Sequence, residues 1–403
     1  MVHLVETHIL LTRPASPLGE RRLPLALRAL LLLVLGILSC PGHGQGAGQW
    51  GIEVIDGGNG RDVGKFSSLA IDRFGNLQVA YYDSTNHSLW YAYRSRSNKR
   101  WYGMQIDPDA GTYASLAVDA RGYPHIASNS WAETGLHYDF WDGKTWHHMI
   151  IDRDRTDHYL SLQLDAAGYP HISYYREYLT GGGFQYALYL KYAYFDGKTW
   201  YLQTVDRHFG SGKSNSIALS QKGHPWIALS EVGSGNLEVA HWRGSKWTFE
   251  TADARSTNGN SYVGLENSIA LDKHGYPHIT YLDSTKARIK YAWEDKNGWH
   301  REVVDQLGGL ESDFDHTSLQ LDKEGWPHVA YYDAGLGALK YAYKDATGWH
   351  VEVVDNAGNV GEYPSLALDA HGMPYISYYD VTNRALKVAH LESTNVSRVK
   401  ERP

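Results

Sequence analysis

Short apolar segments recur along the chain and predict a series of β-strands. Each repeat opens with a small apolar run such as Ser-Leu-Gln-Leu (161–164), and after a turn comes an apolar and aromatic segment such as His-Ile-Ser-Tyr-Tyr (171–175). A third segment of the Leu-Lys-Tyr-Ala-Tyr type and a fourth that begins with Trp complete the repeat. None of these segments shows the sustained 3.6-residue apolar period of a helix. The pattern therefore predicts an all-β protein.

The repeat occurs seven times, which predicts a seven-bladed β-propeller. Its four strands are labelled A to D from the central axis outward. An Asp-x-x-Gly turn joins A to B, where Asp accepts backbone hydrogen bonds and Gly tolerates a positive φ. The spacing of 46 to 55 residues is typical of propeller blades rather than helical arrays, and the opening serines are Ser68, Ser115, Ser161, Ser216, Ser268, Ser318 and Ser365.

The two ends of the chain complement each other. Six strand-D segments begin with Trp, and the seventh repeat stops after its third strand, at residues 386–391. The missing fourth strand has a match at the start of the domain, in Trp-Gly-Ile-Glu-Val-Ile-Asp (50–56). An N-terminal strand that completes the last blade would close the ring and remove an exposed edge. We therefore expect one propeller domain over residues 50–393 and a C-terminal tail over residues 394–403.

The repeats resemble those of bacterial propellers that carry the motif Tyr-Pro-His-Ile-Ser-Tyr-Tyr-Asp. The resemblance covers nearly all of the chain after residue 50 and implies a fold in the neighbourhood of sialidases and ulvan lyases. The sialidase Asp-box (S-x-D-x-G-x-x-W) is not matched, because here the turn glycine is followed by x-Pro. Likeness of fold does not by itself imply function.

The first forty residues differ in kind from the repeats. Arg21 and Arg22 precede an apolar run (23–38) that is too short for a membrane span of about 20 residues and is typical of a secretory signal. The segment that ends at Cys40 resembles a bacterial lipobox, so two alternatives stand: lipidation of Cys40, or ordinary cleavage near residues 42–45. Either predicts a secreted, periplasmic or cell-surface protein that meets a membrane only through a lipid anchor.

Composition narrows the function further. Cys40 is the only cysteine, so the propeller contains no internal disulfide. After residue 39 the chain carries 34 basic and 43 acidic residues, a net charge of −9, whereas nucleic-acid binding normally shows a basic footprint. No nucleic-acid partner and no cofactor are expected, and the chain is expected to be a monomer.

Two conspicuous residue series have structural interpretations. A histidine occupies the same strand-B position in four repeats, which places the four far apart around a ring, so we expect hydrogen bonds between strands rather than a metal site. An Asp follows the strand-B tyrosines in four repeats and is expected to cap a turn. The two series are His125, His171, His278 and His328, and Asp83, Asp283, Asp333 and Asp380.

Departures from the template are expected at one mouth of the ring, where the D–A and B–C loops open together. Arg or Lys beside Tyr and Trp would pair with an acidic group and stack on a sugar. The expected ligand-binding residues are Trp131, Tyr159, Lys213, Lys65, Asp315, His316 and Glu362. Free drift of these loops is the alternative. Asp313, Asp315 and Glu362 offer the oxygen ligands that calcium takes, but their spacing is too generic to predict a metal site.

Three functions remain open. The first is binding of a glycan or a surface protein without catalysis, because the sequence holds no HExxH, CxxC, P-loop or GxSxG motif. The second is a polysaccharide lyase that acts on uronic acid, an analogy with ulvan lyases in which a base near neutral pKa and a cation remove the C5 proton. Its catalytic residues would be His137, His158, Tyr175 and Arg176. The third, a sialidase-like hydrolase, would need an arginine cluster, and these mouth positions supply only one arginine.

Overall fold

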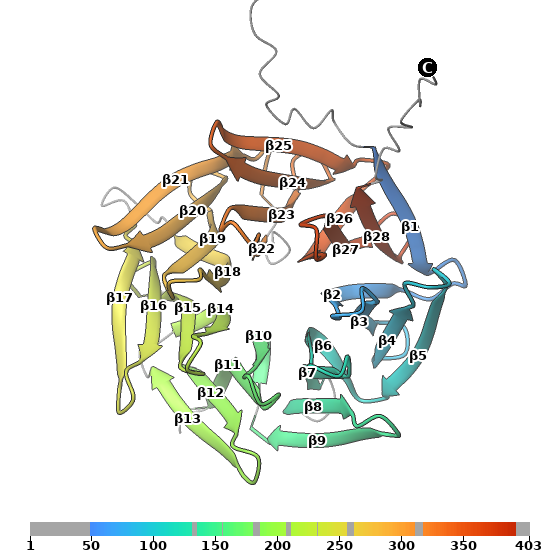
Figure 1. Ribbon diagram of the computed structural model, residues 1–403, viewed down its shortest axis with the longest axis horizontal. Coiled ribbons are helices and arrows are strands. Elements are labelled where there is room, and N and C mark those ends of the chain that lie inside the picture. Colours follow the sequence, from blue (N-terminus) through green and yellow to red (C-terminus); the bar gives the residue numbers. More distant parts are fainter. Residues whose placement is uncertain are drawn as a thin grey trace, which may run out of the picture. The chain divides into compact units, whose positions relative to one another are not determined.

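The computed structural model describes residues 49–130, 135–154, 156–179, 186–206, 211–231, 233–255, 262–310 and 317–391. This part of the chain forms seven four-stranded antiparallel sheets, arranged as the blades of a β-propeller (Figure 1). In each sheet strand A lies nearest the axis and strand D lies at the rim. The predicted all-β, seven-bladed fold is confirmed.

The strands follow the predicted repeat. Blade 1 comprises β2 (Val63–Ile71), β3 (Leu77–Asp83), β4 (Ser88–Arg94) and β5 (Trp101–Asp107). Blade 2 comprises β6 (Ala110–Val118), β7 (Pro124–Ser130), β8 (Leu136–Trp141) and β9 (Trp146–Asp152). Blade 3 comprises β10 (Thr156–Leu164), β11 (Pro170–Leu179), β12 (Tyr186–Phe195) and β13 (Trp200–Asp206). Blades 4 and 5 comprise β14 (Ser211–Leu219), β15 (Pro225–Glu231), β16 (Asn236–Trp242) and β17 (Trp247–Asp253); and β18 (Val263–Leu271), β19 (Pro277–Asp283), β20 (Arg288–Asp295) and β21 (Gly298–Gln306). Blades 6 and 7 comprise β22 (Thr317–Leu321), β23 (Pro327–Asp333), β24 (Ala338–Asp345) and β25 (Gly348–Asp355); and β26 (Val360–Leu368), β27 (Pro374–Asp380), β28 (Ala385–Leu391) and β1 (Trp50–Asp56).

The first strand of the domain completes the last blade. β1 pairs antiparallel with β28, from Trp50 opposite Leu391 to Asp56 opposite Leu386. Its side chains make the contacts of a strand D: the Trp50 indole N–H donates to Glu352 of the sixth blade at 3.0 Å, and Glu53 accepts from the Trp101 indole at 2.9 Å. Trp349 donates to Glu302 in the same way. β1 is therefore a strand D in its side-chain contacts as well as in its pairing.

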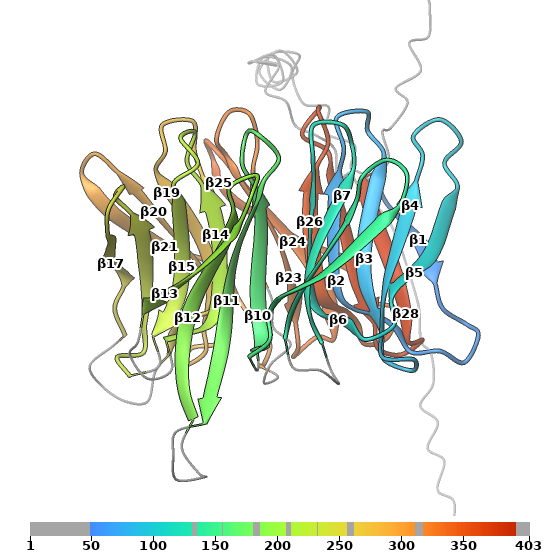
Figure 2. The same ribbon diagram turned by 90° about the horizontal axis from the view of Figure 1, so that it is seen from below.

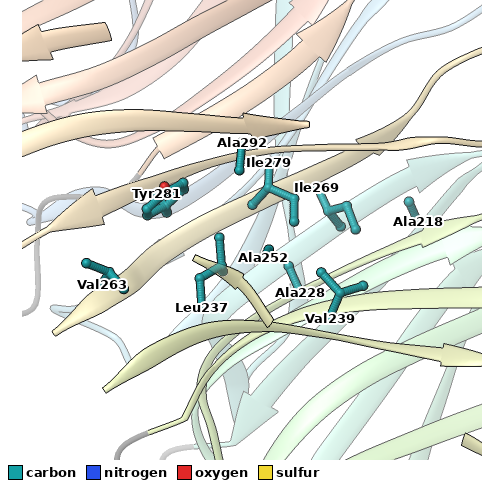
Figure 3. Packing of buried hydrophobic residues seen from close by; sticks show 10 residues of the cluster. All are labelled: Ala218, Ala228, Leu237, Val239, Ala252, Val263, Ile269, Ile279, Tyr281 and Ala292. Atoms are coloured by element: carbon teal, nitrogen blue, oxygen red, sulfur yellow. The ribbon is translucent and has the colours of Figure 1, made fainter. Parts of the chain in front are cut away.

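Apolar clusters lie between neighbouring blades and hold the ring together. Figure 3 shows the cluster between the fourth and fifth blades, in which Leu237 and Val239 of β16 lie with Ile269 and Ile279 of the next blade. Each blade thus buries both faces, and the alternation of side chains along a strand supplies apolar groups to two clusters at once.

The aligned serines link strand A of one blade to strand A of the next. Ser365 Oγ accepts the backbone N–H of Leu69 at 2.9 Å, which joins the seventh blade to the first. Ser216 departs from the series and donates to Asn267 Oδ1 at 2.8 Å. The other acceptor and donor pairs are Ser68 and Leu116, Ser115 and Leu162, Ser161 and Ile217, Ser268 and Leu319, and Ser318 and Leu366.

The strand-B histidines make hydrogen bonds between strands, as predicted. The ring Nδ1 of each meets the hydroxyl of a strand-C tyrosine, in the pairs His125 and Tyr138, His171 and Tyr192, His278 and Tyr291, and His328 and Tyr341. In the first blade Gln78 takes this position and accepts from Tyr91 at 2.8 Å. Burial lowers the pKa of all four histidines, that of His125 to about 4.

The aspartate that ends strand D is contacted from the next blade. The aspartates of blades 4 to 6 each contact both a strand-B tyrosine and a strand-C lysine of the following blade, which we call the Tyr-Asp-Lys contact. In the last of these, Asp355 lies 2.7 Å from the Tyr378 hydroxyl and 3.2 Å from Lys387 Nζ. Three of the predicted turn-capping aspartates, Asp83, Asp283 and Asp380, accept backbone N–H groups two or three residues further on. The fourth, Asp333, accepts the N–H of Gly308 instead.

Within the described residues, no helix is long and apolar enough to cross a membrane. In the third blade, strands B and C are longer than in the other blades: β11 and β12 have ten residues each and pair out to Leu179 and Tyr186. In the side view this hairpin projects beyond the neighbouring strands (Figure 2).

We predict that Trp50→Ala destabilises the propeller by about 3 kcal/mol, because it removes a packed indole and its hydrogen bond from the closing strand. Val54→Ala, at an exposed position of the same strand, should change stability by less than about 0.5 kcal/mol. Urea unfolding monitored by circular dichroism measures both. Equal losses for the two variants would contradict the role given to Trp50.

We also predict that the buried histidines make the fold acid-sensitive. Because the folded-state pKa of His125 is about 4 and the unfolded value is about 6.5, the unfolded chain binds more protons between these values, and stability falls as the pH is lowered through this window. His125→Gln copies the first blade and should flatten that fall by up to about 1.4 kcal/mol per pH unit. Unfolding free energies from pH 7 to pH 4 measure it. The exposed His371→Gln should leave the slope unchanged.

Candidate ligand-binding sites

A small pocket lies on the axis, lined by strand-A residues of five blades. Its volume is about 140 Å³, and its walls are the rings of Phe66, Tyr113, Tyr159 and Tyr363 together with backbone and hydroxyl groups of the aligned serines. Phe66 lies 4.2 Å from Tyr113 and 4.5 Å from Tyr363 between ring centroids. Tyr159, one of the expected ligand-binding residues, is part of the pocket lining.

Three of the four rings that line this pocket stand at positions with a left-handed backbone. Phe66, Tyr113 and Tyr363 have φ between 52° and 53°, and Glu266 at the matching position has φ 51°. The A–B ladder also changes register there in each of these blades. Such a conformation costs a non-glycine residue roughly 1 kcal/mol or more and is concentrated at functional sites. Tyr159 of the third blade also donates a hydrogen bond to Glu266 of the fifth blade.

Among the other expected mouth residues, the structure describes the side chains of Lys65 and Glu362. Lys65 Nζ is 2.8 Å from Asp62 and lies over the ring of Tyr379, and Glu362 is buried. His158 and Lys213 lie on β10 and β14, and their side chains are outside the described part. Trp131, Asp315, His316 and Cys40 are also outside the described residues.

Three of the four residues expected of a lyase are buried or already paired. His137 on β8 is buried, with Nδ1 3.1 Å from Asp107 Oδ2 of the first blade. Tyr175 on β11 is only 2% exposed, and Arg176 forms an ion pair with Asp154. These contacts favour structural roles for the three.

A larger groove lies between the second and third blades, near the A–B and C–D hairpins. Its volume is about 950 Å³, within the range of small-molecule sites. The groove lies toward the face of the A–B and C–D hairpins, whereas the sequence predicted a site on the opposite face, where the D–A and B–C loops open. A second groove of about 510 Å³ lies between the seventh and first blades, with Tyr375 as its one aromatic lining residue.

Aromatic side chains form two walls of the larger groove. On one wall Phe140 stacks between His125 and His147, at centroid distances of 5.8 and 4.7 Å. On the other wall Tyr169 packs edge-on against Phe195, which lies 5.6 Å from Trp200. Tyr169 is 37% exposed, so part of its ring is open to a ligand.

Charges of both signs border the groove. Arg121 pairs with Asp119 at 2.8 Å, and His147 pairs with Asp142 at 2.8 Å, while the exposed Lys198 lies on the C–D hairpin of the third blade. The Asp142 carboxylate has its pKa lowered by the hydrogen bond from His147 and by backbone N–H groups. The groove thus combines aromatic faces with hydrogen-bonding groups and has no excess of cations.

Sequence reasoning missed this groove because its residues belong to the template. Tyr169 and Phe195 fill ordinary repeat positions on different strands, and only their arrangement across one blade makes a wall. Arg121 lies in the A–B turn of the second blade, and Lys198 lies in the C–D hairpin of the third. No departure from the repeat marks them, so a comparison of repeats could not have found them.

Comparisons with known proteins show the fold. No protein-family model and no curated protein matches the chain. Among solved structures, a triple arginine-to-alanine variant of AofleA from Arthrobotrys oligospora is 13% identical with a TM-score of 0.52, over 77% of this chain and 90% of that one. The fucose-specific lectin of Aleuria aurantia is 14% identical with a TM-score of 0.50, over 75% and 98% of the two chains. A PL25 ulvan lyase has a TM-score of 0.46, at 14% identity over 74% and 79%.

Proposed function

We propose that this protein is a non-catalytic glycan-binding propeller that holds its ligand in the groove between the second and third blades. The observation that carries the proposal is the pair of aromatic walls, with Tyr169 partly open to solvent. Aromatic faces stack on the apolar faces of sugar rings, and the neighbouring carboxylates accept hydrogen bonds from sugar hydroxyls.

Volume favours the groove over the axial pocket. A cavity of about 150 Å³ holds a single ring the size of benzene, and the axial pocket of about 140 Å³ has no room for more. The groove of about 950 Å³ accommodates several sugar residues. The left-handed aromatic positions at the axis are therefore assigned to closing the channel.

Charge favours a neutral glycan. Arg121 and Lys198 are outnumbered by Asp119, Asp142 and Asp165 in the groove lining, and Arg121 is already paired. A polyanion would meet net repulsion there. The groove therefore suits a neutral sugar better than the acidic sugar that the sequence suggested.

Two further points support a glycan ligand outside the cytoplasm. A fucose-specific lectin is among the solved structures that share the fold. A secretory signal of the kind predicted for residues 1–40, with or without lipidation of Cys40, would carry the propeller to the cell surface or beyond. There the ligand would be a glycan on a surface or a free polysaccharide.

The lyase alternative has less support from the geometry. Its expected base, His137, is buried against Asp107, and Tyr175 is nearly inaccessible to a polymer. A rise in ultraviolet absorbance from unsaturated product with a uronate polymer, abolished in His137→Ala, would revive it.

We predict that Tyr169→Ala weakens glycan binding at least about tenfold, because it removes the exposed stacking surface, a loss of about 1.4 kcal/mol. A glycan array identifies the ligand, and calorimetric titration measures the Kd. Tyr276→Ala is the matched control, since Tyr276 holds the same repeat position in the fifth blade, outside the groove.

Binding that survives Tyr169→Ala but is lost in Tyr113→Ala would move the site to the axial pocket. Absence of binding to every glycan on the array would overturn the proposal.

A further inference from the structure

The interface between the first and second blades lacks the Tyr-Asp-Lys contact. The carboxylate is present, as Asp107 at the end of β5. The strand-B tyrosine is replaced by Ser128 and the strand-C lysine by His137, which contacts Asp107 at 3.1 Å. Two substitutions at one interface thus change the groups that face a buried carboxylate.

A third departure adds a second carboxylate at the same place. Asp139 stands on β8 where the other blades have Ala92, Ala193, Ala240, Ala292, Ala342 and Ala389, and it is 0% exposed. The β8–β9 ladder places it directly opposite His148, whose Nδ1 contacts Asp139 Oδ1 at 2.5 Å. One ligand atom from each of Asp107, Asp139 and His148 lies within 4.8 Å of the others.

Hydrogen bonding within the protein leaves part of this cluster unsatisfied. Asp139 Oδ2, His137 Nε2 and Ser128 Oγ are buried and have no hydrogen-bond partner among the described residues. A buried carboxylate oxygen without a partner costs free energy of order 1–3 kcal/mol or more. A cation bound to that oxygen would offset this cost.

We propose that Asp107, Asp139 and His148 bind a divalent transition-metal ion, with Zn²⁺ as the best match. One imidazole nitrogen and two carboxylates are a donor set that zinc accepts, with a fourth position left to water. His148 is 46% exposed, which provides an entry path and room for that water. The set has too few oxygens for Ca²⁺, which takes six to eight.

His137 acts as a positioning residue for this metal. Its ring N–H orients the Asp107 carboxylate, as second partners orient metal ligands elsewhere. The ion would join β5 of the first blade to β8 and β9 of the second, at the position where the Tyr-Asp-Lys contact is missing. This inference is independent of the proposed glycan site, although His148 also borders the groove.

The test uses the full chain after treatment with a chelator, titrated with Zn²⁺ by calorimetry and unfolded thermally with and without the metal. One Zn²⁺ per chain and a rise in Tm of at least about 3 °C are expected. Co²⁺ should give the visible absorption bands of a tetrahedral site. Asp139→Ala restores the residue of the other blades, so it should fold, and it should lose affinity at least about 100-fold.

His148→Val, which copies Val351 of the sixth blade, should lose binding to a similar extent. His147→Ala is the matched control, because His147 is adjacent in sequence but pairs with Asp142. Unchanged Zn²⁺ affinity in Asp139→Ala, or equal loss in His147→Ala, overturns the assignment.

Discussion

The structure depends on the requirement that every blade be covered on both faces. Each sheet contributes apolar side chains to two clusters, so a blade without a neighbour would expose a large apolar surface. Seven blades satisfy this only as a closed ring, and closure requires that the first and last segments of the domain share one sheet. Two hydrogen bonds support the same closure: the backbone N–H of Leu69 donates to Ser365, and the Trp50 indole N–H donates to Glu352.

Much of this architecture could be predicted from the sequence because it is encoded locally and repeated. The Asp-x-x-Gly turns, the strand-D tryptophans and the aligned serines each have one physical role, and the structure shows that role in blade after blade. The segment that begins at Trp50 predicts how the ring closes. The last repeat lacks a fourth strand and the first repeat is preceded by a surplus one, so the surplus strand completes the last blade. The histidine series was also interpreted correctly, because each ring contacts a strand-C tyrosine of its own blade.

The sites could not be predicted to the same degree, because they depend on which way side chains point. His137 was expected at the mouth, but the alternation of β8 turns it toward Asp107 of the preceding blade. Asp139, two residues further on, alone replaces an alanine at that position, but the sequence does not show which groups its side chain faces. The groove between the second and third blades is formed by template residues, so departures from the repeat gave no signal for it.

The register of the closing strand sets how the ring responds to load. Trp50, the entry residue of β1, lies opposite Leu391, the exit residue of β28, so the chain enters and leaves the seventh blade at the same end of the ladder. Tension applied through the two flanking segments would part β1 from β28 one hydrogen bond at a time, as a zipper opens, rather than shear all of them together. The ring is therefore mechanically softest at its seam, where the packed indole of Trp50 is the first contact to bear the force.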